Sequence, residues 1–255
     1  MYKQLRDFLR GSRIAFSMYS TIPMGQCEWK TEDMRLVMSG FPLIGTLLGG
    51  LAVGLAFLAQ RLDWPVQLMA AGQLMLMVAV TGGIHLDGLV DVADAWKSYG
   101  DHDKRREILK DPHIGGFALI YGATYLILLT TAYSLISAQR AGLLIGIYTL
   151  SRITSAFGVI LLPKMSDRGS VSFLAKAAAA RANLLLLTME LVLTVVGLIL
   201  AGGWLSVAVV ISQLLIFLFY IRWSRRVFGG TNGDTAGALL QVSELLMILL
   251  LGLWP

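Results

Sequence analysis

Long apolar blocks, each about as long as a bilayer is thick, are the feature that most constrains this chain. The blocks cover residues 41–60, 65–86, 115–137, 141–162, 184–201, 203–221 and 236–254. A helix needs roughly 20 apolar residues to cross the hydrocarbon core of a membrane. The chain is 56% hydrophobic and 15% charged, whereas soluble domains carry about 25% charged residues. The sequence therefore predicts an all-α, polytopic transmembrane helix bundle with about seven spans.

The chain is expected to form a single integral membrane domain over residues 1–255, because no linker, long charge run or internal repeat divides it. Residues 1–38 begin with the basic, amphipathic sequence MYKQLRDFLRGSR, which predicts a cytosolic segment that lies on the membrane surface or packs under the bundle. Residues 39–255 form the transmembrane bundle, with a tight hairpin expected at Gly202. The single cysteine, Cys27, excludes an internal disulfide and a cysteine-based zinc cluster.

The distribution of basic residues predicts that the N-terminus is cytosolic. In that orientation all 21 Lys and Arg residues fall on the cytosolic side except Arg61 and Arg140, which lie outside, and Arg152, which lies within a span. Such an excess is typical of cytosolic loops. The topology explains the net charge of +5 without nucleic acid as a partner, and it makes membrane lipid the expected surroundings. Chemistry on water-soluble substrates is predicted at the cytosolic face, where the long polar loops lie.

Three aspartates follow the second apolar block, Asp87, Asp91 and Asp94. In a helix that continues this block they share one face within a roughly 60° arc. Like charges at this spacing destabilise a helix, and the residues between them are apolar instead of the Lys or Glu typical of a solvated face. A hard divalent cation such as Mg²⁺ commonly bridges carboxylates to substrate phosphates. The pattern predicts a metal site, with a solvated acidic helix end as the alternative.

The residues around these aspartates supply further candidates. His85 falls nearly opposite the three aspartates on the same helix, which favours a structural hydrogen-bonding role unless a nearby glycine breaks the helix. In the next loop the basic residues 104–106 and Lys110 are suited to hold phosphate oxygens, although topology alone accounts for their charge. Asp111, immediately before the third block, is better placed to join the site.

Two charges lie at membrane depth, and a glycine-rich loop precedes the last block. Arg152 and Glu244 are costly there unless they are paired or face a water-filled cavity, so they are either structural partners of each other or part of a site. The loop 229–235 reads GGTNGDT. Its glycines allow close approach of a ligand to the backbone, and the helix N-terminus that follows favours anions. Asp234 is equally suited to be a helix cap.

These residues resemble those of a known family. Residues 83–91 read GIHLDGLVD and, with Asp94, resemble the signature of cobalamin synthase, also called adenosylcobinamide-GDP ribazoletransferase. The likeness extends in order and spacing along most of the chain, through residues 41–45, 108–111, 114–115, 151–152, 229–235 and 244. Residues 163–169 and 175–181 match weakly, so no site role is assigned to that loop.

The resemblance implies the last assembly step of the vitamin B12 nucleotide loop. Adenosylcobinamide-GDP would be joined to α-ribazole or α-ribazole 5′-phosphate, with release of GMP, in a Mg²⁺-dependent reaction. Asp87, Asp91 and Asp94 would hold Mg²⁺, and one of them, or Asp111, would accept the proton of the attacking ribose hydroxyl. The remaining candidates for substrate binding are His85, Lys110, Arg152, Thr231, Asn232, Asp234 and Glu244.

The resemblance also implies a location and partners. It places the protein in the cytoplasmic (inner) membrane of a bacterium or archaeon, with the active site facing the cytosol. Other membrane-bound enzymes of cobamide biosynthesis are the expected protein partners.

Two other functions remain as alternatives. CDP-alcohol phosphotransferases also use stacked intramembrane aspartates and release a nucleoside monophosphate. Their motif has an Ala-Arg pair after the first aspartates and a longer spacing, whereas here Asp94 follows Asp91 by three residues with no such pair between them. A transporter would use Arg152 and Glu244 as coupling charges. Transporters often contain inverted repeats, and the sequence shows none.

Overall fold

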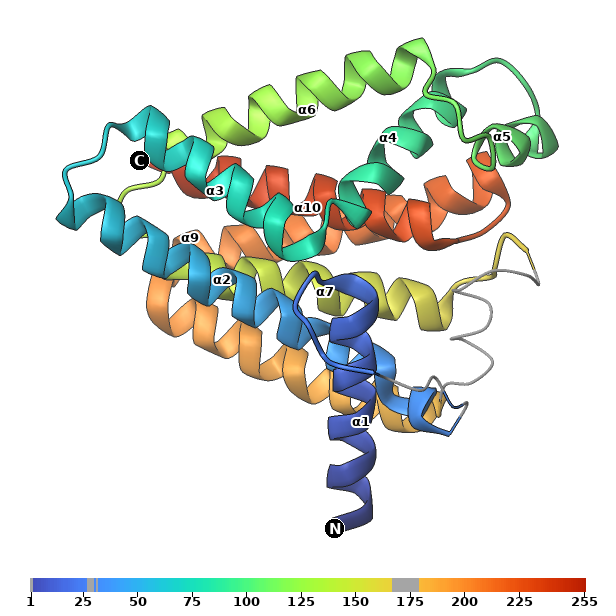
Figure 1. The fold of residues 1–255 in the computed structure, drawn as a ribbon, viewed down its shortest axis with the longest axis horizontal. Coiled ribbons are helices and arrows are strands. Elements are labelled where there is room, and N and C mark those ends of the chain that lie inside the picture. Colours follow the sequence, from blue (N-terminus) through green and yellow to red (C-terminus); the bar gives the residue numbers. More distant parts are fainter. Residues whose placement is uncertain (1, 27–29, 31, 167–178) are drawn as a thin grey trace.

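The computed structural model describes residues 2–26, 30, 32–166 and 179–255, and in these ranges its regular elements are helices, apart from one isolated β-bridge between Lys164 and Thr231. Figure 1 shows the helices, which in chain order are α1 (Tyr2–Tyr19), the 3-10 helix η1 (Asp33–Leu36), α2 (Val37–Arg61), α3 (Val66–Thr81), α4 (Ile84–Lys97), α5 (His102–Ile108), α6 (Gly116–Ser134), α7 (Leu143–Leu161), α9 (Ala180–Phe228) and α10 (Gly233–Leu253).

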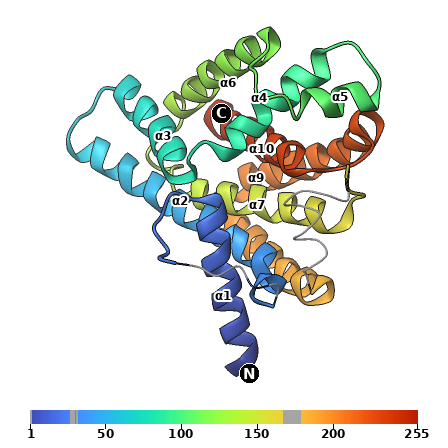
Figure 2. The same ribbon diagram turned by 45° about the vertical axis from the view of Figure 1, so that its right-hand side comes forward.

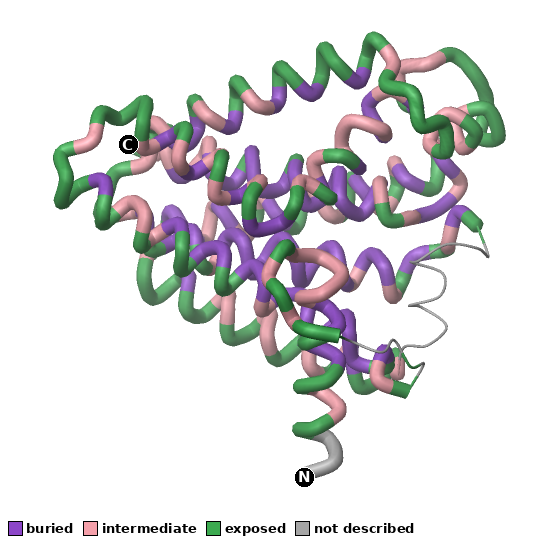
Figure 3. Tube along the Cα trace, in the orientation of Figure 1, coloured by how far each residue is buried: buried purple, intermediate pink, exposed green. Residues whose placement is uncertain are grey.

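The centre of the bundle is built from α7 and α10. Each of these helices contains an apolar stretch of 18 residues. The buried share of this stretch is 78% in α7 and 67% in α10, whereas it is 11% in α9. Figure 3 shows the buried residues concentrated along these two central helices. A helix that is apolar on all sides is suited to such a position. The outer helices α6 and α9 present many apolar side chains to the surroundings, as expected of helices that face lipid.

Several helices are long and apolar enough to cross a membrane. Five meet this description, namely the η1–α2 segment, α6, α7, α9 and α10, and the bent pair α3–α4 raises the number to six if it is counted as one span. The predicted all-α, multi-pass membrane bundle is therefore confirmed. The number of seven spans and the cytosolic location of the N-terminus stay predictions.

The long helix α9 reverses direction at Gly203, whose backbone is left-handed (φ 53°). Before this point, Leu198 lies against Gly146 near the start of α7. After it, Gln213 donates a hydrogen bond to Thr154, further along the same helix, at 2.7 Å. Both arms therefore run along α7, as Figure 1 shows. The predicted hairpin at this place is confirmed, and glycine is the residue that adopts such a conformation at least cost.

A break between α3 and α4 corrects one expectation. The second apolar block, 65–86, was expected to form a helix that runs directly into the aspartates. Instead α3 ends at Thr81, and Gly82 (φ 64°) and Gly83 (φ 74°) are both left-handed. The axis of α4 is bent by 95° from that of α3. Two successive left-handed glycines end one helix and start the next in a new direction, so α4 lies nearly at right angles to α3.

The helix α1 packs under the bundle along its second half. An added Cβ at Gly40 of α2 would lie 2.4 Å from the Cα of Ser12. The two helices therefore cross at Gly40, where the absence of a side chain lets their backbones come close. Ile14 is buried at this crossing, while Leu9 is exposed. In Figures 1 and 2 the N-terminal end of α1 extends away from the other helices. The second half of α1 therefore packs against α2, and Cys27 lies outside the described residues.

Candidate active site

The close contact between α4 and the start of α10 assembles the site. An added Cβ at Gly88 would lie 2.8 Å from the Cα of Asp234, and one at Gly237 would lie 3.3 Å from the Cα of His85. Small residues allow helix backbones to approach this closely. The contact places the first turn of α10 beside the helix that carries the three aspartates.

Four carboxylates form what we call the acidic group: Asp87, Asp91 and Asp94 on α4 and Asp234 on α10. Asp87, Asp234 and Asp94 each interact electrostatically with Asp91, and Asp87 also interacts with Asp234. Asp87 is exposed and the other three are half-buried. Like charges held this close repel one another, and a cation between them relieves the repulsion. The predicted grouping of the α4 aspartates is seen, and Asp234 joins it.

Asp94 has a structural partner at the start of α6. Its Oδ1 accepts a hydrogen bond from the backbone N–H of Ala118 at 3.3 Å. An added Cβ at Gly115 would lie 2.2 Å from both carboxylate oxygens, so glycine leaves the room that Asp94 occupies. A carboxylate at a helix N-terminus satisfies free N–H groups and complements the helix dipole. Among the described residues the side chains of Asp87 and Asp91 have no such hydrogen bond, so these two are better placed to bind a ligand.

The glycine-rich loop before α10 is held by Asn232, which is the cap of that helix. Its Oδ1 accepts from the backbone N–H of Thr235 at 2.9 Å, and the Thr235 hydroxyl accepts from the backbone N–H of Asn232 at 3.0 Å. The amide of Asn232 also donates to Asp234 Oδ2 at 2.7 Å. The alternative that Asp234 is the cap is therefore wrong, and Asn232 instead orients the Asp234 carboxylate.

Thr231 fixes this loop from the inside. Its buried hydroxyl lies 2.6 Å from the Tyr220 hydroxyl, its backbone N–H donates to Pro163 at 2.8 Å, and its carbonyl accepts from Met165 at 2.9 Å. The Thr231 side chain is not placed to meet a substrate. The same pairing sets Lys164 beside the loop, where burial lowers the pKa of its ammonium group. Sequence reasoning gave this lysine no role because its loop matches the family weakly; residues 167–178 lie outside the described structure.

The basic residues of α5 are used to dock that helix on the end of α9. Arg106 Nε donates to the carbonyl of Phe228 at 3.0 Å, and Arg105 donates to the carbonyl of Val227 at 3.3 Å. Basic side chains satisfy the last carbonyls of a helix and complement its dipole. The structure thus gives a packing role to two of the residues that the sequence suggested for phosphate binding.

Asp111 and Lys110 lie on the surface after α5, and both are exposed. Asp111 Oδ1 accepts from the backbone N–H of His113 at 3.0 Å and lies 2.6 Å from the His113 ring. These hydrogen bonds, the one from the backbone first, lower the pKa of Asp111. Among the described residues, no hydrogen bond or ion pair connects Asp111 or Lys110 to the acidic group. The structure does not bring these two candidates together with the other aspartates.

Arg152 and Glu244 pair with each other in the centre of the bundle. Arg152 Nη1 lies 2.5 Å from Glu244 Oε1, and the two side chains are 0% and 2% exposed. The same Glu244 oxygen accepts from the Ser151 hydroxyl at 2.8 Å, and Arg152 also donates to the carbonyl of Tyr148 at 2.9 Å. The alternative that the two charges are structural partners is confirmed. The predicted substrate-binding role of Arg152 and Glu244 stays a prediction.

His85 is buried between aromatic rings on the side of α4 away from the three aspartates. Its ring is stacked on that of Tyr19, with centroids 5.9 Å apart, and meets that of Phe41 edge-on at 5.6 Å. The helix break precedes His85, so the histidine and the aspartates still share one helix. Its Nε2 has no hydrogen-bond partner among the described residues. The structural hydrogen bond expected of His85 is not found.

The carboxylate donors fit Mg²⁺ by their chemistry. Hard oxygen ligands suit this ion, which commonly takes one or two protein carboxylates together with substrate phosphates and water. Among the described residues, no three His, Cys, Asp or Glu side chains are grouped closely enough to hold a metal ion by themselves. The acidic group therefore fits a metal that is held jointly with a phosphorylated substrate, and it does not fit an all-protein metal cage.

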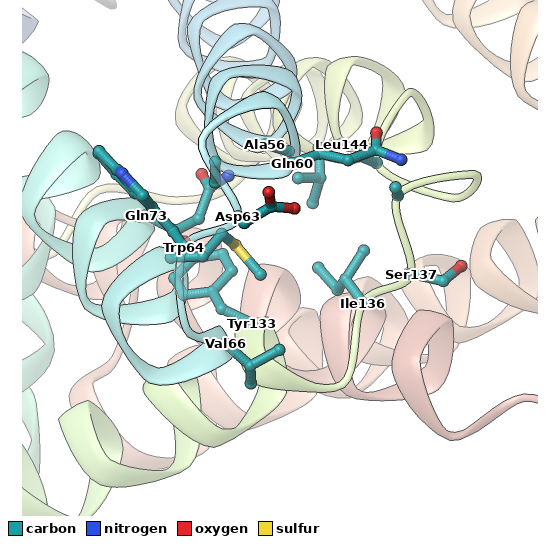
Figure 4. A pocket seen from close by; sticks show the side chains of 14 residues that line it. Ala56, Gln60, Asp63, Trp64, Val66, Gln73, Tyr133, Ile136, Ser137 and Leu144 are labelled. Carbon is teal, nitrogen blue, oxygen red and sulfur yellow. The ribbon is translucent and has the colours of Figure 1, made fainter.

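A separate pocket of about 250 Å³ lies at the opposite end of the bundle (Figure 4). It lies between the end of α2, the start of α3, the end of α6 and the start of α7. Its polar side chains include Gln60, Asp63 and Gln73, and none of the acidic group takes part. This pocket is not part of the candidate active site.

Comparison with known proteins agrees with the resemblance seen in the sequence. Adenosylcobinamide-GDP ribazoletransferase from Lachnoclostridium phytofermentans is 35% identical to this chain over 91% of the chain and 89% of that protein. The enzyme of the same name from Pseudomonas aeruginosa is 33% identical over 98% of this chain and its own full length. No solved structure matches the chain. The sequence profile of cobalamin-5-phosphate synthase matches residues 11–252. The chain is a member of the cobalamin-5-phosphate synthase family.

Proposed function

We propose that this protein transfers the cobinamide phosphate group of adenosylcobinamide-GDP to α-ribazole or α-ribazole 5′-phosphate. GMP is released, and adenosylcobalamin or its 5′-phosphate is formed. The observation that carries this proposal is the acidic group at the crossing of α4 and α10, in a chain that belongs to this family along nearly its whole length. The donor is a diphosphate, and its reaction needs a site that binds a metal-bound phosphate.

The acidic group supplies the ligands for Mg²⁺ in this proposal. Asp87 and Asp91 would hold the ion, Asp234 stands on the facing helix, and Asp94 anchors α4 to the start of α6. When bound, Mg²⁺ neutralises charge on the diphosphate as it reacts. Lys164, beside the loop 229–235, and the backbone amides of Gly233 and Asp234, which have no hydrogen-bond partner among the described residues, are the groups suited to hold phosphate oxygens.

The chemistry is a phosphoryl substitution. A ribose hydroxyl of the acceptor attacks the phosphorus that bears the cobinamide, and the bond from this phosphorus to the oxygen shared with GMP breaks. A carboxylate of the acidic group accepts the hydroxyl proton, and the electron pair of the broken bond leaves with GMP. Positioning and electrostatic stabilisation provide most of the rate enhancement in such reactions.

The proposed location is the cytoplasmic membrane with the acidic group on the cytosolic side. The starts of α2 and α10 and the end of α7 lie at the end of the bundle that carries α4, because residues from all four helices meet around His85. The basic residues predict that this end is cytosolic. Both substrates would then reach the acidic group from the cytosol.

The purified protein, in detergent or in nanodiscs, is expected to release GMP from adenosylcobinamide-GDP only when α-ribazole and Mg²⁺ are both present. Removal of Mg²⁺ with EDTA should abolish turnover, and added Mg²⁺ should restore it, because the acidic group requires a cation. GMP and the new corrinoid can be separated by chromatography and should appear in equal amounts.

The Pseudomonas aeruginosa relative, assayed in parallel, is the positive control for substrates and conditions. A folded preparation of this protein that forms no corrinoid product while that relative does would contradict the proposed activity. Full turnover in the presence of EDTA would contradict the proposed metal.

Replacing Gly88 by alanine tests whether the contact between α4 and α10 assembles the site. The added methyl group would meet the backbone of Asp234 at 2.8 Å, so the helices must move apart. Turnover is expected to fall about tenfold or more, because a misplacement of about 1 Å in an active site can cost 10²-fold. Gly50→Ala on α2 is the matched control, since nothing lies within 4 Å of its added Cβ. Equal activity in both variants would mean that this contact does not matter to the reaction.

A further inference from the structure

A cavity of about 140 Å³ lies on the side of α4 opposite the three aspartates. Side chains from α1, α2, α4, α7 and the start of α10 line it, and most of them are apolar or aromatic. The residues on which the argument depends are Tyr19, Phe41, His85, Ser155, Asp234 and Gly237. A cavity of about this size holds one small aromatic molecule in other proteins. It is therefore large enough for a bare ring system and too small for a whole nucleotide.

One wall of this cavity consists of three aromatic rings. Tyr19 and Phe41 lie 4.7 Å apart, and each also contacts the ring of His85. Planar bases bind to proteins by stacking on such rings, because every base has a π-face. The shape and the chemistry of this wall favour a planar aromatic ligand.

His85 adds a polar atom that has no partner. The residue is only 6% exposed, and its Nε2 forms no hydrogen bond to any described residue. A buried polar atom left unpaired costs about 1–3 kcal/mol, and such atoms in a folded protein call for an explanation. The hydroxyl of Ser155, on the same cavity, is already bonded to the carbonyl of Ala236 at 3.2 Å. His85 Nε2 is thus left without a partner, on a side chain that lines the cavity.

Asp234 connects this cavity to the acidic group. Its residue lines the cavity, and its carboxylate interacts electrostatically with Asp87 and Asp91. Asp234 is therefore the point at which a ligand in the cavity comes nearest to the acidic group. A nucleoside suits this arrangement, with a flat base joined to a ribose that carries the hydroxyl groups.

We propose that the cavity holds the base of the acceptor nucleoside, a fused azole such as benzimidazole, with His85 Nε2 paired to the free ring nitrogen. The inference rests on the proposed function. A benzimidazole riboside has one ring nitrogen in the glycosidic bond and one free, and the rest of its base is apolar. Guanine, the other base in the reaction, has several donors and acceptors on its edges, and most would be left unpaired here.

The test compares His85→Leu and His85→Gln with the wild-type protein in nanodiscs, with α-ribazole and adenosylcobinamide-GDP varied in turn. His85→Leu is expected to raise the KM for α-ribazole about tenfold, the effect of one lost hydrogen bond. The KM for adenosylcobinamide-GDP and kcat should stay within about twofold of the wild-type values. His85→Gln retains a hydrogen-bonding group and should recover part of the loss. The matched control is His102→Leu on α5, a histidine that contacts the carbonyl of Arg226 and lies outside the site.

Free benzimidazole provides a second measurement that needs no variant. It should inhibit wild-type turnover competitively against α-ribazole and not against adenosylcobinamide-GDP. Competition against the donor, or a His85→Leu variant whose KM rises for the donor alone, would assign the cavity to guanine and overturn the proposal. An unchanged KM for α-ribazole in a folded, active His85→Leu variant would overturn it as well.

The failure of the proposed function would look different. In that case the wild-type protein itself would form no corrinoid product and release no GMP. Isothermal titration of benzimidazole into the wild-type protein and into His85→Leu would then test the cavity alone. Equal binding by the two proteins would remove the base site, and weaker binding by the variant would support it.

Discussion

Replacing Asp91 by asparagine is expected to reduce kcat by about 10²-fold or more, and Asp87→Asn should have a similar effect. A bound metal supplies several kcal/mol of charge stabilisation in the transition state, and about 1.4 kcal/mol corresponds to a factor of ten in rate. Both variants should also need more Mg²⁺ for half-maximal GMP release, because each removes one negative charge from the acidic group. The measurement is a Mg²⁺ titration of GMP release by purified, folded protein.

Asp103→Asn on α5 is the matched control for these variants. Asp103 is exposed, its carboxylate lies 3.6 Å from Arg106 on the same helix, and it is not part of the acidic group. Its replacement should leave turnover and the Mg²⁺ dependence unchanged. Near-normal turnover with an ordinary Mg²⁺ dependence in both Asp87→Asn and Asp91→Asn would remove the two residues from the mechanism.

Asp94 should behave differently from its two neighbours on α4. Its carboxylate bonds to the start of α6, and an asparagine retains an oxygen that accepts the same hydrogen bond. Asp94→Asn is therefore expected to retain more activity than Asp91→Asn, whereas Asp94→Ala loses the bond and about 1 kcal/mol of stability. Equal and severe losses in Asp94→Asn and Asp91→Asn would show that Asp94 is a metal ligand after all.

The second large effect is expected at the buried ion pair. Glu244→Gln leaves the Arg152 guanidinium without its counter-charge in a fully buried position, and breaking such a pair costs about 3–5 kcal/mol. The variant should unfold at a lower temperature or denaturant concentration, as followed by circular dichroism in detergent. The double variant Arg152→Met, Glu244→Leu should recover most of this stability, because paired apolar replacements of a buried ion pair are often neutral.

Glu107→Gln is the control for the ion-pair experiment. Glu107 pairs with Lys104 at 3.0 Å, but the side chains of Lys104 and Glu107 are 55% and 72% exposed, and surface pairs contribute about 0–1 kcal/mol. If Glu244→Gln were as stable as the wild-type protein but had a raised KM for adenosylcobinamide-GDP, Arg152 would be a substrate contact instead of a structural partner.

The apolar blocks predicted most of the helices because burial in lipid or in the bundle selects for apolarity along the whole element. The blocks 141–162 and 236–254 correspond to α7 and α10 within a few residues. The second block does not correspond to one helix, because the chain breaks at Gly82 and Gly83, a break that the sequence allowed but did not place. The sequence does not reveal that both adopt positive φ, and this conformation alone separates α3 from α4.

The candidate site, too, could be predicted from the sequence only in part. The three aspartates of α4 share a face because their spacing is local, and the helix break before Ile84 does not alter it. The contacts of Asp94 with α6 and of Gly88 with Asp234 join elements far apart in the chain, so local spacing does not contain them. Asn232 and Asp234 are equally good caps by residue type, and only the hydrogen bonds show which one caps α10.

The bend before α4 has a consequence for the depth at which charge is held. If α4 continued the direction of a membrane-crossing α3, Asp94 would lie about 10 Å further from the bilayer than Asp87, since each helical residue advances about 1.5 Å. Because the axis turns by 95°, the aspartates of α4 are instead spread sideways from the line of α3. They therefore stay near one level along the axis of α3, beside the start of α10, where Gly88 meets Asp234.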